Sequence, residues 1–172
     1  RADRETDNDN PIEKAEDVAR LDKDSKKFLI NVTNYPSLTV TQRYDELSLK
    51  GRYAQDLKQS LIDRKMIEEI FLAIGSSKQS TFLVPTQKAI DYLDSIEEST
   101  RFYKHIGKTS PLHQLIQAMI IEYFTDKNCV VQNDYQLGEK FVDVYLESNK
   151  VAFEVAVNPA IDAERVSSAL DF

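Results

Sequence analysis

The sequence predicts a mixed protein, of the α+β or α/β class, with two organised regions at residues 25–95 and 110–172. Apolar residues in the first region recur at helical spacing and then give way to two short strand-like runs. The second region opens with an apolar helical segment, and three strand-like runs follow it. Periodicity lapses between the two regions, so we expect residues 96–109 to form a linker. A chain of 172 residues is long enough for one large domain or two small ones.

The composition is that of an ordinary globular protein and excludes several classes. Hydrophobic residues make up 41% of the chain and charged residues 30%. No apolar run approaches the roughly 20 residues of a membrane span, and no signal-peptide pattern opens the chain. The single cysteine, Cys129, excludes an internal disulfide framework. We therefore expect a cytoplasmic protein without a membrane segment.

The net charge of −7 is unevenly distributed. Acidic residues outnumber basic ones in residues 1–20 and 96–172, whereas residues 21–95 are nearly neutral. Phosphate groups respond to charge within about 8–10 Å, so an acidic total weakens but does not exclude binding of nucleic acid.

Residues 1–24 are polar, highly charged and free of aromatic side chains. This composition is typical of a disordered leader or of a linker from an upstream domain. Because the sequence opens on Arg1, we expect it to be a fragment of a longer protein, and the second region is expected to continue beyond residue 172.

The first region parses as three helices, a hairpin and a fourth helix. A helix that begins at Ser25 stops before Pro36. Thr39 with Gln42 three residues later has the spacing of a capping box. Ser48 is the expected cap of the long third helix. The hairpin joins "IEEIFLAIG" to "TFLVP". The last helix, "TQKAIDYLDSI", should turn three apolar residues inward: Ala89, Ile90 and Leu93. This is the element order of a winged helix-turn-helix.

The third helix carries the candidate nucleic-acid contacts. At 100° per residue, four residues fall on one side as a core stripe: Leu49, Tyr53, Leu57 and Leu61. The opposite side presents side chains that can hydrogen-bond to base edges and phosphates: Arg52, Gln55, Lys58 and Gln59. Lys50, in the first turn of this expected helix, and Lys78, in the hairpin connection, are candidates for the same role. The alternative is an ordinary solvated helix face.

Residues 36–70 resemble winged-helix modules found near the C-termini of ring-forming, DNA-pumping ATPases of conjugation and repair systems. The shared pattern is a small-residue turn, then "TQRYDELSL", then "LKQSLIDRKMIEE", then a wing. The resemblance implies contact with DNA or with neighbouring subunits of a ring, an upstream ATPase domain, and an oligomeric assembly.

The second region is expected to be a helix followed by a three-strand meander. Ser110 is the expected cap, with Pro111 at the first helical position. Five residues are expected to form the buried stripe of this helix: Leu112, Leu115, Ile116, Met119 and Tyr123. The expected strands cover residues 129–135, 141–146 and 151–157.

The turn between the last two strands fixes the register of two acidic residues. If Ser148 and Asn149 form a two-residue turn, Asp143 lies directly opposite Glu154. Opposed like charges destabilise a sheet by up to about 1 kcal/mol, and a bridging Mg²⁺ or Mn²⁺ would relieve that repulsion. The pair is therefore a candidate metal site for phosphodiester hydrolysis. The alternative is an edge hairpin with one polar face.

Residues 110–168 are similar in element order to the PD-(D/E)XK, or restriction-endonuclease-like, superfamily. The resemblance implies that Asp143 and Glu154 bind a metal ion and that "NPAIDAERVSSAL" forms the helix after the meander. It also implies an acidic residue or a histidine on the first helix as a third catalytic group. His113 fits that role, because Glu122 lies about 180° away on the helix.

The sequence departs from this superfamily at one position. The superfamily's lysine, which is expected to orient water and stabilise developing charge, would fall where this chain has Ala156. Either the site is degenerate, or a cation such as Lys140 or Arg165 substitutes. We therefore expect a DNA-binding and DNA-processing accessory region with an active or degenerate metal-dependent nuclease site. The alternatives are a non-catalytic DNA- or subunit-interaction module and a transcriptional regulator.

Overall fold

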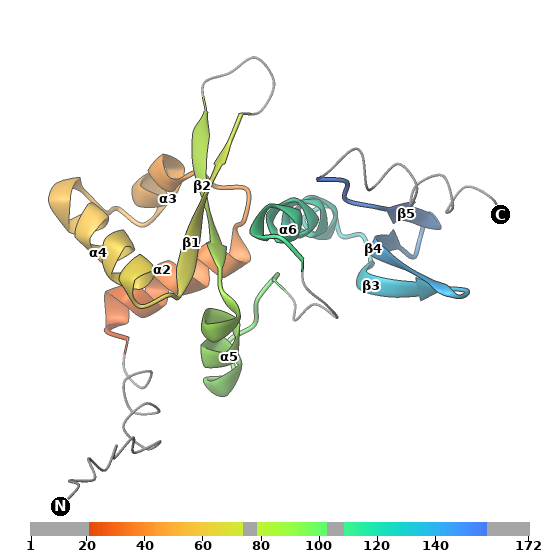
Figure 1. Ribbon diagram of the computed structural model, residues 1–172, viewed down its shortest axis with the longest axis horizontal. Coiled ribbons are helices and arrows are strands. Elements are labelled where there is room, and N and C mark those ends of the chain that lie inside the picture. Colours follow the sequence, from red (N-terminus) through yellow and green to blue (C-terminus); the bar gives the residue numbers. More distant parts are fainter. Residues whose placement is uncertain (1–20, 74–78, 103–108, 158–172) are drawn as a thin grey trace, which may run out of the picture.

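The computed structural model describes residues 21–73, 79–102 and 109–157. This part of the chain is a mixed α+β structure with five helices and two small antiparallel sheets, and all five of these helices precede the second sheet. Helices α2 to α4 and the hairpin β1–β2 lie on one side of helix α6, and the three-stranded sheet lies on the other (Figure 1). The β1–β2 hairpin and the three-stranded sheet, which are far apart in sequence, therefore both lie next to helix α6 (Figure 1).

Helix α2, Lys23–Asn34, begins two residues earlier than the sequence predicts. The reason is its cap: the Asp22 carboxylate accepts hydrogen bonds from the backbone N–H groups of Asp24 and Ser25. Residues 22–24 therefore belong to the fold and not to the leader, while residues 1–20 lie outside the described part.

Helices α3, Val40–Glu46, and α4, Gly51–Asp63, follow with different caps. The capping box of Thr39 and Gln42 is confirmed. The expected cap at Ser48 is wrong: the N-cap is Lys50, which makes no side-chain capping bond. Ser48 has a φ of 55° and lies in the turn that joins the two helices.

The core stripe of α4 also differs from the expected one at Tyr53. That side chain is 52% exposed, whereas Ala54 is 1% exposed. Ala54, Leu57 and Leu61 are spaced three and four residues apart and form the buried face. The Tyr53 hydroxyl instead donates a hydrogen bond to the Asp24 carboxylate at 2.5 Å.

The predicted hairpin is confirmed. Strands β1, Ile67–Leu72, and β2, Ser80–Pro85, pair antiparallel with Ile67 opposite Pro85. Helix α5, Gln87–Ser95, is capped by Thr86. Its three predicted inward residues are all buried: Ala89, Ile90 and Leu93.

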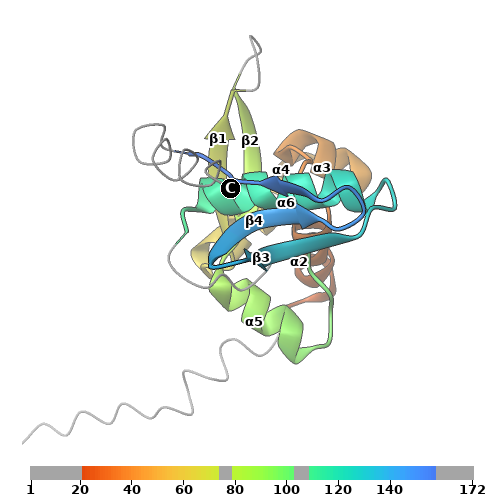
Figure 2. The same ribbon diagram turned by 90° about the vertical axis from the view of Figure 1, so that its right-hand side faces the viewer.

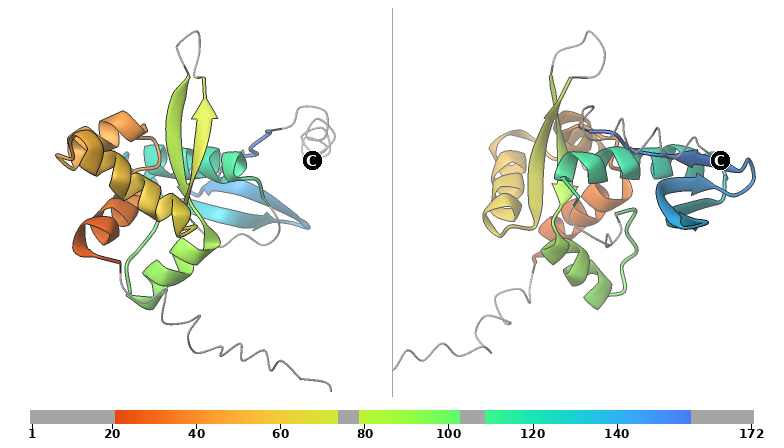
Figure 3. Two further views of the ribbon diagram at one scale, coloured as in Figure 1. Left: turned by 60° about the vertical axis from the view of Figure 1, so that its left-hand side comes forward. Right: turned by 45° about the vertical axis from the view of Figure 1, so that its right-hand side comes forward.

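Helix α6, Pro111–Thr125, begins at the predicted Ser110 cap and packs on both of its sides. Leu115 and Ala118 join Phe82 and Val84 of β2 in one core cluster, to which Phe102 from the expected linker also belongs. Views from other directions show α6 between the hairpin and the second sheet (Figures 2 and 3).

The predicted buried stripe of α6 is therefore only partly right. Leu115 is fully buried, but Tyr123 is 58% exposed. The buried set includes polar residues that a one-sided apolar stripe does not predict: His113, Gln117 and Glu122. A helix covered on two faces has no single apolar stripe.

The second sheet has the order β3-β4-β5. Its strands are Val131–Leu137, Lys140–Leu146 and Val151–Phe153. The predicted turn register is confirmed, because Leu146 pairs with Val151. The third strand ends at residue 153, so the expected extent of 151–157 is too long. No helix in the described ranges is long and apolar enough to cross a membrane.

Candidate functional site

The candidate site lies where β5 separates from β4. The ladder between these strands ends at the pair Val144–Phe153. Beyond it, the backbone N–H of Val155 donates to Oδ2 of Asp143 at 2.7 Å. The side-chain carboxylate of Asp143 thus accepts a hydrogen bond where a main-chain carbonyl would accept it in a continuing ladder. The Asp143 side chain occupies the fork, the gap that opens between β4 and β5 after this last pair.

Helix α6 brings His113 to the same carboxylate. The Ser110 hydroxyl accepts a hydrogen bond from the His113 backbone N–H at 3.2 Å, which fixes the first turn. From that turn the His113 Nε2 atom lies 3.1 Å from Oδ1 of Asp143. The two side chains are 10% and 18% exposed, respectively. Two of the predicted catalytic residues, 30 positions apart in sequence, therefore form one contact.

Glu154, the third predicted residue, is exposed and follows directly after β5. It does not sit inside the ladder as predicted, because the strand has ended one residue earlier. Its carboxyl group still forms a hydrogen-bonding interaction with Asp143 that contributes to the ionisation of that residue. The two acids therefore lie together, with Asp143 recessed and Glu154 facing solvent.

The ionisation of Asp143 reflects opposing effects. Burial raises its pKa, but the hydrogen bond from His113, the bond from the Val155 N–H, the charge of His113 and the interaction with Glu154 all lower it. The sum holds the pKa of Asp143 below its ordinary value of 3.8. Asp143 is therefore a carboxylate at neutral pH despite its recessed position.

The described residues contain no group of three or more His, Cys, Asp or Glu side chains arranged to hold a metal ion. Two carboxylates are nevertheless enough for Mg²⁺ when substrate oxygens complete the coordination. Asp143 and Glu154 are two carboxylates that lie together in the described part of the chain.

Gln117 is a site residue that the sequence did not reveal. It is 1% exposed, and its Nε2 atom lies 2.7 Å from the Asp143 carbonyl oxygen and 2.6 Å from Oδ1 of Asn133. Its Oε1 atom is buried without a hydrogen-bond partner in the described structure. Gln117 lies four residues after His113, so both side chains lie on one face of α6. This spacing is the signal by which the sequence could have revealed Gln117. Gln117 fixes the backbone of Asp143, whereas His113 fixes its side chain.

The backbone of β3 departs from regular geometry beside this contact. Asp134 has a φ of 46° within the strand, and its Oδ1 atom lies 3.2 Å from the Gln117 Nε2 atom. Left-handed backbone at a residue other than glycine costs free energy and is found where surrounding contacts enforce it. The strained residue lies at the register position opposite Asp143, between the pairs Asn133–Val144 and Tyr135–Val142.

Glu122 lies on the other side of α6, as the helical wheel predicts. Its Oε2 atom accepts a hydrogen bond from the Ser37 backbone N–H at 2.9 Å. Burial lowers the pKa of the nearby Arg43 to about 10, while the charge of Glu122 acts in the opposite direction. Glu122 therefore joins α6 to the turn between α2 and α3 and takes no part in the acidic site.

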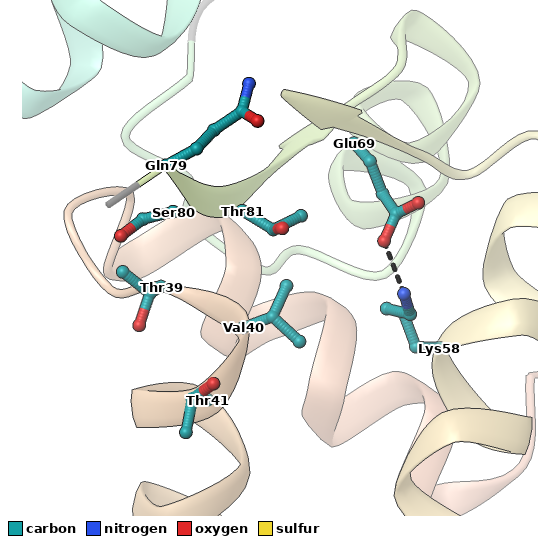
Figure 4. Close-up of a pocket in the computed structure, with 8 residues that line it drawn as sticks. All are labelled: Thr39, Val40, Thr41, Lys58, Glu69, Gln79, Ser80 and Thr81. Atoms are coloured by element: carbon teal, nitrogen blue, oxygen red, sulfur yellow. Dashed lines mark hydrogen bonds and ion pairs between the residues drawn. The ribbon is translucent and has the colours of Figure 1, made fainter. Parts of the chain in front are cut away.

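The candidate nucleic-acid face on α4 is nearly neutral. Arg52 pairs with Asp56 at 3.7 Å, and Lys58 pairs with Glu69 of β1 (Figure 4). Lys50, Gln55 and Gln59 are exposed, and the Gln59 amide donates to the Asp63 carboxylate at 2.8 Å. Lys78 lies outside the described residues. The predicted face exists, but both cations of the helix already have acidic partners.

A polar cleft of about 270 Å³ opens between this face and the hairpin (Figure 4). Its walls come from the start of α3, from α4 and from both strands: Thr39, Val40, Thr41, Lys58, Glu69, Gln79, Ser80 and Thr81. Burial and the charge of Glu69, one of the lining residues, raise the pKa of Tyr44.

Comparisons with family models, with curated proteins and with solved structures give no match. The roles of these residues therefore rest on the geometry of this chain.

Of the two cations proposed to replace the missing lysine, Lys140 lies within the described residues and Arg165 does not. Ala156 is exposed beyond the end of β5, and Lys140 opens β4 three residues before Asp143. Arg165 and the predicted helix after residue 157 lie outside the described residues.

Proposed function

We propose that this chain is part of a DNA-processing protein whose acidic site hydrolyses phosphodiester bonds with the help of a divalent cation. In this proposal, α2 to α4 with the hairpin form a winged helix-turn-helix. Helix α6 with β3 to β5 forms the first half of a restriction-endonuclease-like core. The observation that carries the proposal is the contact of Asp143 with His113, the Val155 amide and Glu154.

Asp143 and Glu154 would hold Mg²⁺ or Mn²⁺ through their carboxylate oxygens. When bound, such a cation acts as a Lewis acid toward the scissile phosphate. The chain's own residues supply the positioning. The Val155 N–H and the His113 ring occupy one oxygen each of Asp143. They keep this carboxylate ionised and restrict its rotation.

His113 is proposed to take over part of the task of the missing lysine. Position 156 is alanine and carries no charge. The His113 Nε2 atom lies 3.1 Å from Oδ1 of Asp143, so an imidazole, a group used in general acid–base catalysis, lies at the carboxylate centre. A His113→Ala variant should therefore lower the cleavage rate and change its pH profile, whereas loss of a purely structural histidine would leave the profile unchanged.

The decisive experiment is a cleavage assay on single- and double-stranded DNA with Mg²⁺ or Mn²⁺. Asp143→Asn and Glu154→Gln should each lower cleavage by more than about a hundredfold, since ligand loss exceeds the cost of losing an outer-shell group. Glu139→Gln is the matched control, because Glu139 is an exposed acid in the adjacent turn. Equal activity in all three variants would contradict the proposal.

A second candidate function is a subunit-docking module with no catalysis. The observation that favours it is the pairing of Arg52 and Lys58 with acids of the same chain. Such a face offers little charge for phosphate contacts but is compatible with a protein surface. Charge reversal by Arg52→Glu should weaken DNA binding at low salt if α4 contacts DNA. If α4 contacts a neighbouring ATPase subunit instead, the reversal should disturb assembly and leave DNA affinity unchanged.

A further inference from the structure

Two aromatic residues flank the acidic site on the same strand. The burial of β4 alternates strictly: Val142, Val144 and Leu146 are buried, and the residues between them are not. Phe141 and Tyr145 therefore lie on the face of the sheet that carries Asp143, one on each side of it. Phe141 is 57% exposed.

Tyr145 is held in a fixed orientation by a second aromatic ring. The rings of Tyr135 and Tyr145 stack with centroids 4.3 Å apart and an angle of 9° between their planes. A regular ladder would put Tyr135 on the same face as its partner Val142, but the left-handed residue Asp134 precedes Tyr135 and interrupts the alternation, so the Tyr135 ring meets that of Tyr145. A ring packed in this way loses little conformational entropy when a ligand stacks on it.

We propose that Phe141 and the Tyr135–Tyr145 pair are stacking sites for unpaired nucleobases on either side of the phosphodiester that a cation at Asp143 and Glu154 would hold. This inference rests on the proposed function and names its substrate class as single-stranded or locally unpaired nucleic acid. Residues two apart in a strand are about 6.6 Å apart, so each ring lies within one nucleotide's reach of the acid.

The chemistry of the surface favours an unpaired strand over a duplex. Bases in a duplex are stacked on both faces and show proteins only their edges, whereas unpaired bases offer a face to aromatic rings. The second half of the chain is acidic, so dense phosphate contacts cannot supply the affinity. Stacking does not depend on cationic residues.

The test measures binding by fluorescence anisotropy of a labelled oligo-dT in EDTA, where no cleavage occurs. Phe141→Ala and Tyr145→Ala should each weaken the Kd by about fivefold to a hundredfold, the range found for loss of one stacked base. Tyr145→Phe keeps the ring and should bind like the parent chain. Tyr123→Ala is the matched control, since this aromatic is 58% exposed at the other end of α6.

An abasic oligonucleotide and a duplex complete the test. Both should bind more weakly than oligo-dT, and the two alanine variants should not weaken them further. Equal affinity for all three ligands, or unchanged affinity in both variants, would overturn the inference. So would self-association of the chain that Phe141→Ala abolishes, because the rings would then form an interface between copies. Asp143→Asn separates the two proposals: it should lose cleavage but keep the preference for oligo-dT.

Discussion

Helix α6 separates two recessed polar clusters, one around Arg43 and one around Asp143, whose hydrogen-bonding groups find their partners in different ways. On one side, the fully buried Arg43 donates from both terminal nitrogens to Asn31 and to the carbonyl oxygens of Tyr35 and Leu38. On the other side, Asp143 is bonded to His113 and Val155, but its side chain stays 18% exposed next to the solvent-facing Glu154.

The difference separates a structural cluster from a candidate reactive one. The terminal nitrogens of Arg43 are directed at main-chain oxygens inside the protein, where no ligand can reach them. A buried charge persists in a fold only with such partners. The acidic cluster keeps oxygen atoms available to solvent, and only groups of that kind can bind a cation or substrate. Burial of a charged residue therefore does not by itself mark a site.

The largest expected effect is on the enclosed side. Arg43→Met should lower the free energy of unfolding by about 3–5 kcal/mol, because Glu122 loses its cationic neighbour and several carbonyl groups lose their donor. Urea unfolding followed by circular dichroism measures it. Arg52→Met, which breaks an exposed pair, should cost less than about 0.5 kcal/mol. A similar, small cost for both variants would contradict the structural role of Arg43.

Gln117→Leu tests the backbone contact on the open side. The change keeps most of the side-chain volume but leaves the Asp143 carbonyl and Asn133 without their donor, so we expect a loss of about 1–3 kcal/mol. Cleavage should fall more than stability predicts, because Asp143 loses its positioning. The control is Gln114→Leu on the same helix, which removes hydrogen bonds to Thr109, just before the helix. Its cleavage activity should be unchanged.

The pH dependence of stability tests the ionisation of Asp143. Its pKa is lower in the folded state than its ordinary value of 3.8. The stability it contributes is therefore present above that ordinary value and is lost as the pH falls through the folded pKa. Asp143→Asn should flatten the decline of the unfolding free energy below about pH 4, measured by thermal melts. The exposed Asp63→Asn variant should keep the decline of the parent chain.

The smallest effects on stability are expected at two helix caps. Thr39 caps α3, near the Arg43 cluster, and Ser110 caps α6, near the Asp143 cluster. Thr39→Ala and Ser110→Ala should each cost about 1 kcal/mol, since both side chains accept a backbone N–H of the first turn. Only Ser110→Ala should also lower cleavage, because the Ser110 hydroxyl holds the turn that carries His113. Equal losses of cleavage in both variants would mean that activity follows stability alone.

Local signals predicted what depends on neighbouring residues in the chain. The Thr39–Gln42 box, the Ser110 cap and the turn register at Leu146 and Val151 all follow from short-range hydrogen bonding. The approach of His113 to Asp143 required more than spacing, and it came from the resemblance to a known superfamily. The predictions of the caps and of the turn register held because caps and tight turns are fixed by a few adjacent groups.

The errors about which side chains are buried share one physical cause, which is packing by elements distant in sequence. Tyr53 and Tyr123 look like core residues by periodicity. The elements that pack against α4 and α6 bury other faces of these helices, so both side chains stay exposed. Gln117 and Glu122 look like solvated polar residues, yet the second sheet and the α2–α3 turn cover them.

The sequence by itself determined the order of the helices and strands, the register of the β4–β5 hairpin and the acidic residues placed close together at the end of that hairpin. Only the tertiary structure decided that Asp143 fills a fork, that Gln117 holds its backbone, and that Arg52 and Lys58 are already paired. The reason is that a local rule fixes the geometry of adjacent residues. The partners of a side chain depend instead on which distant surface packs against it.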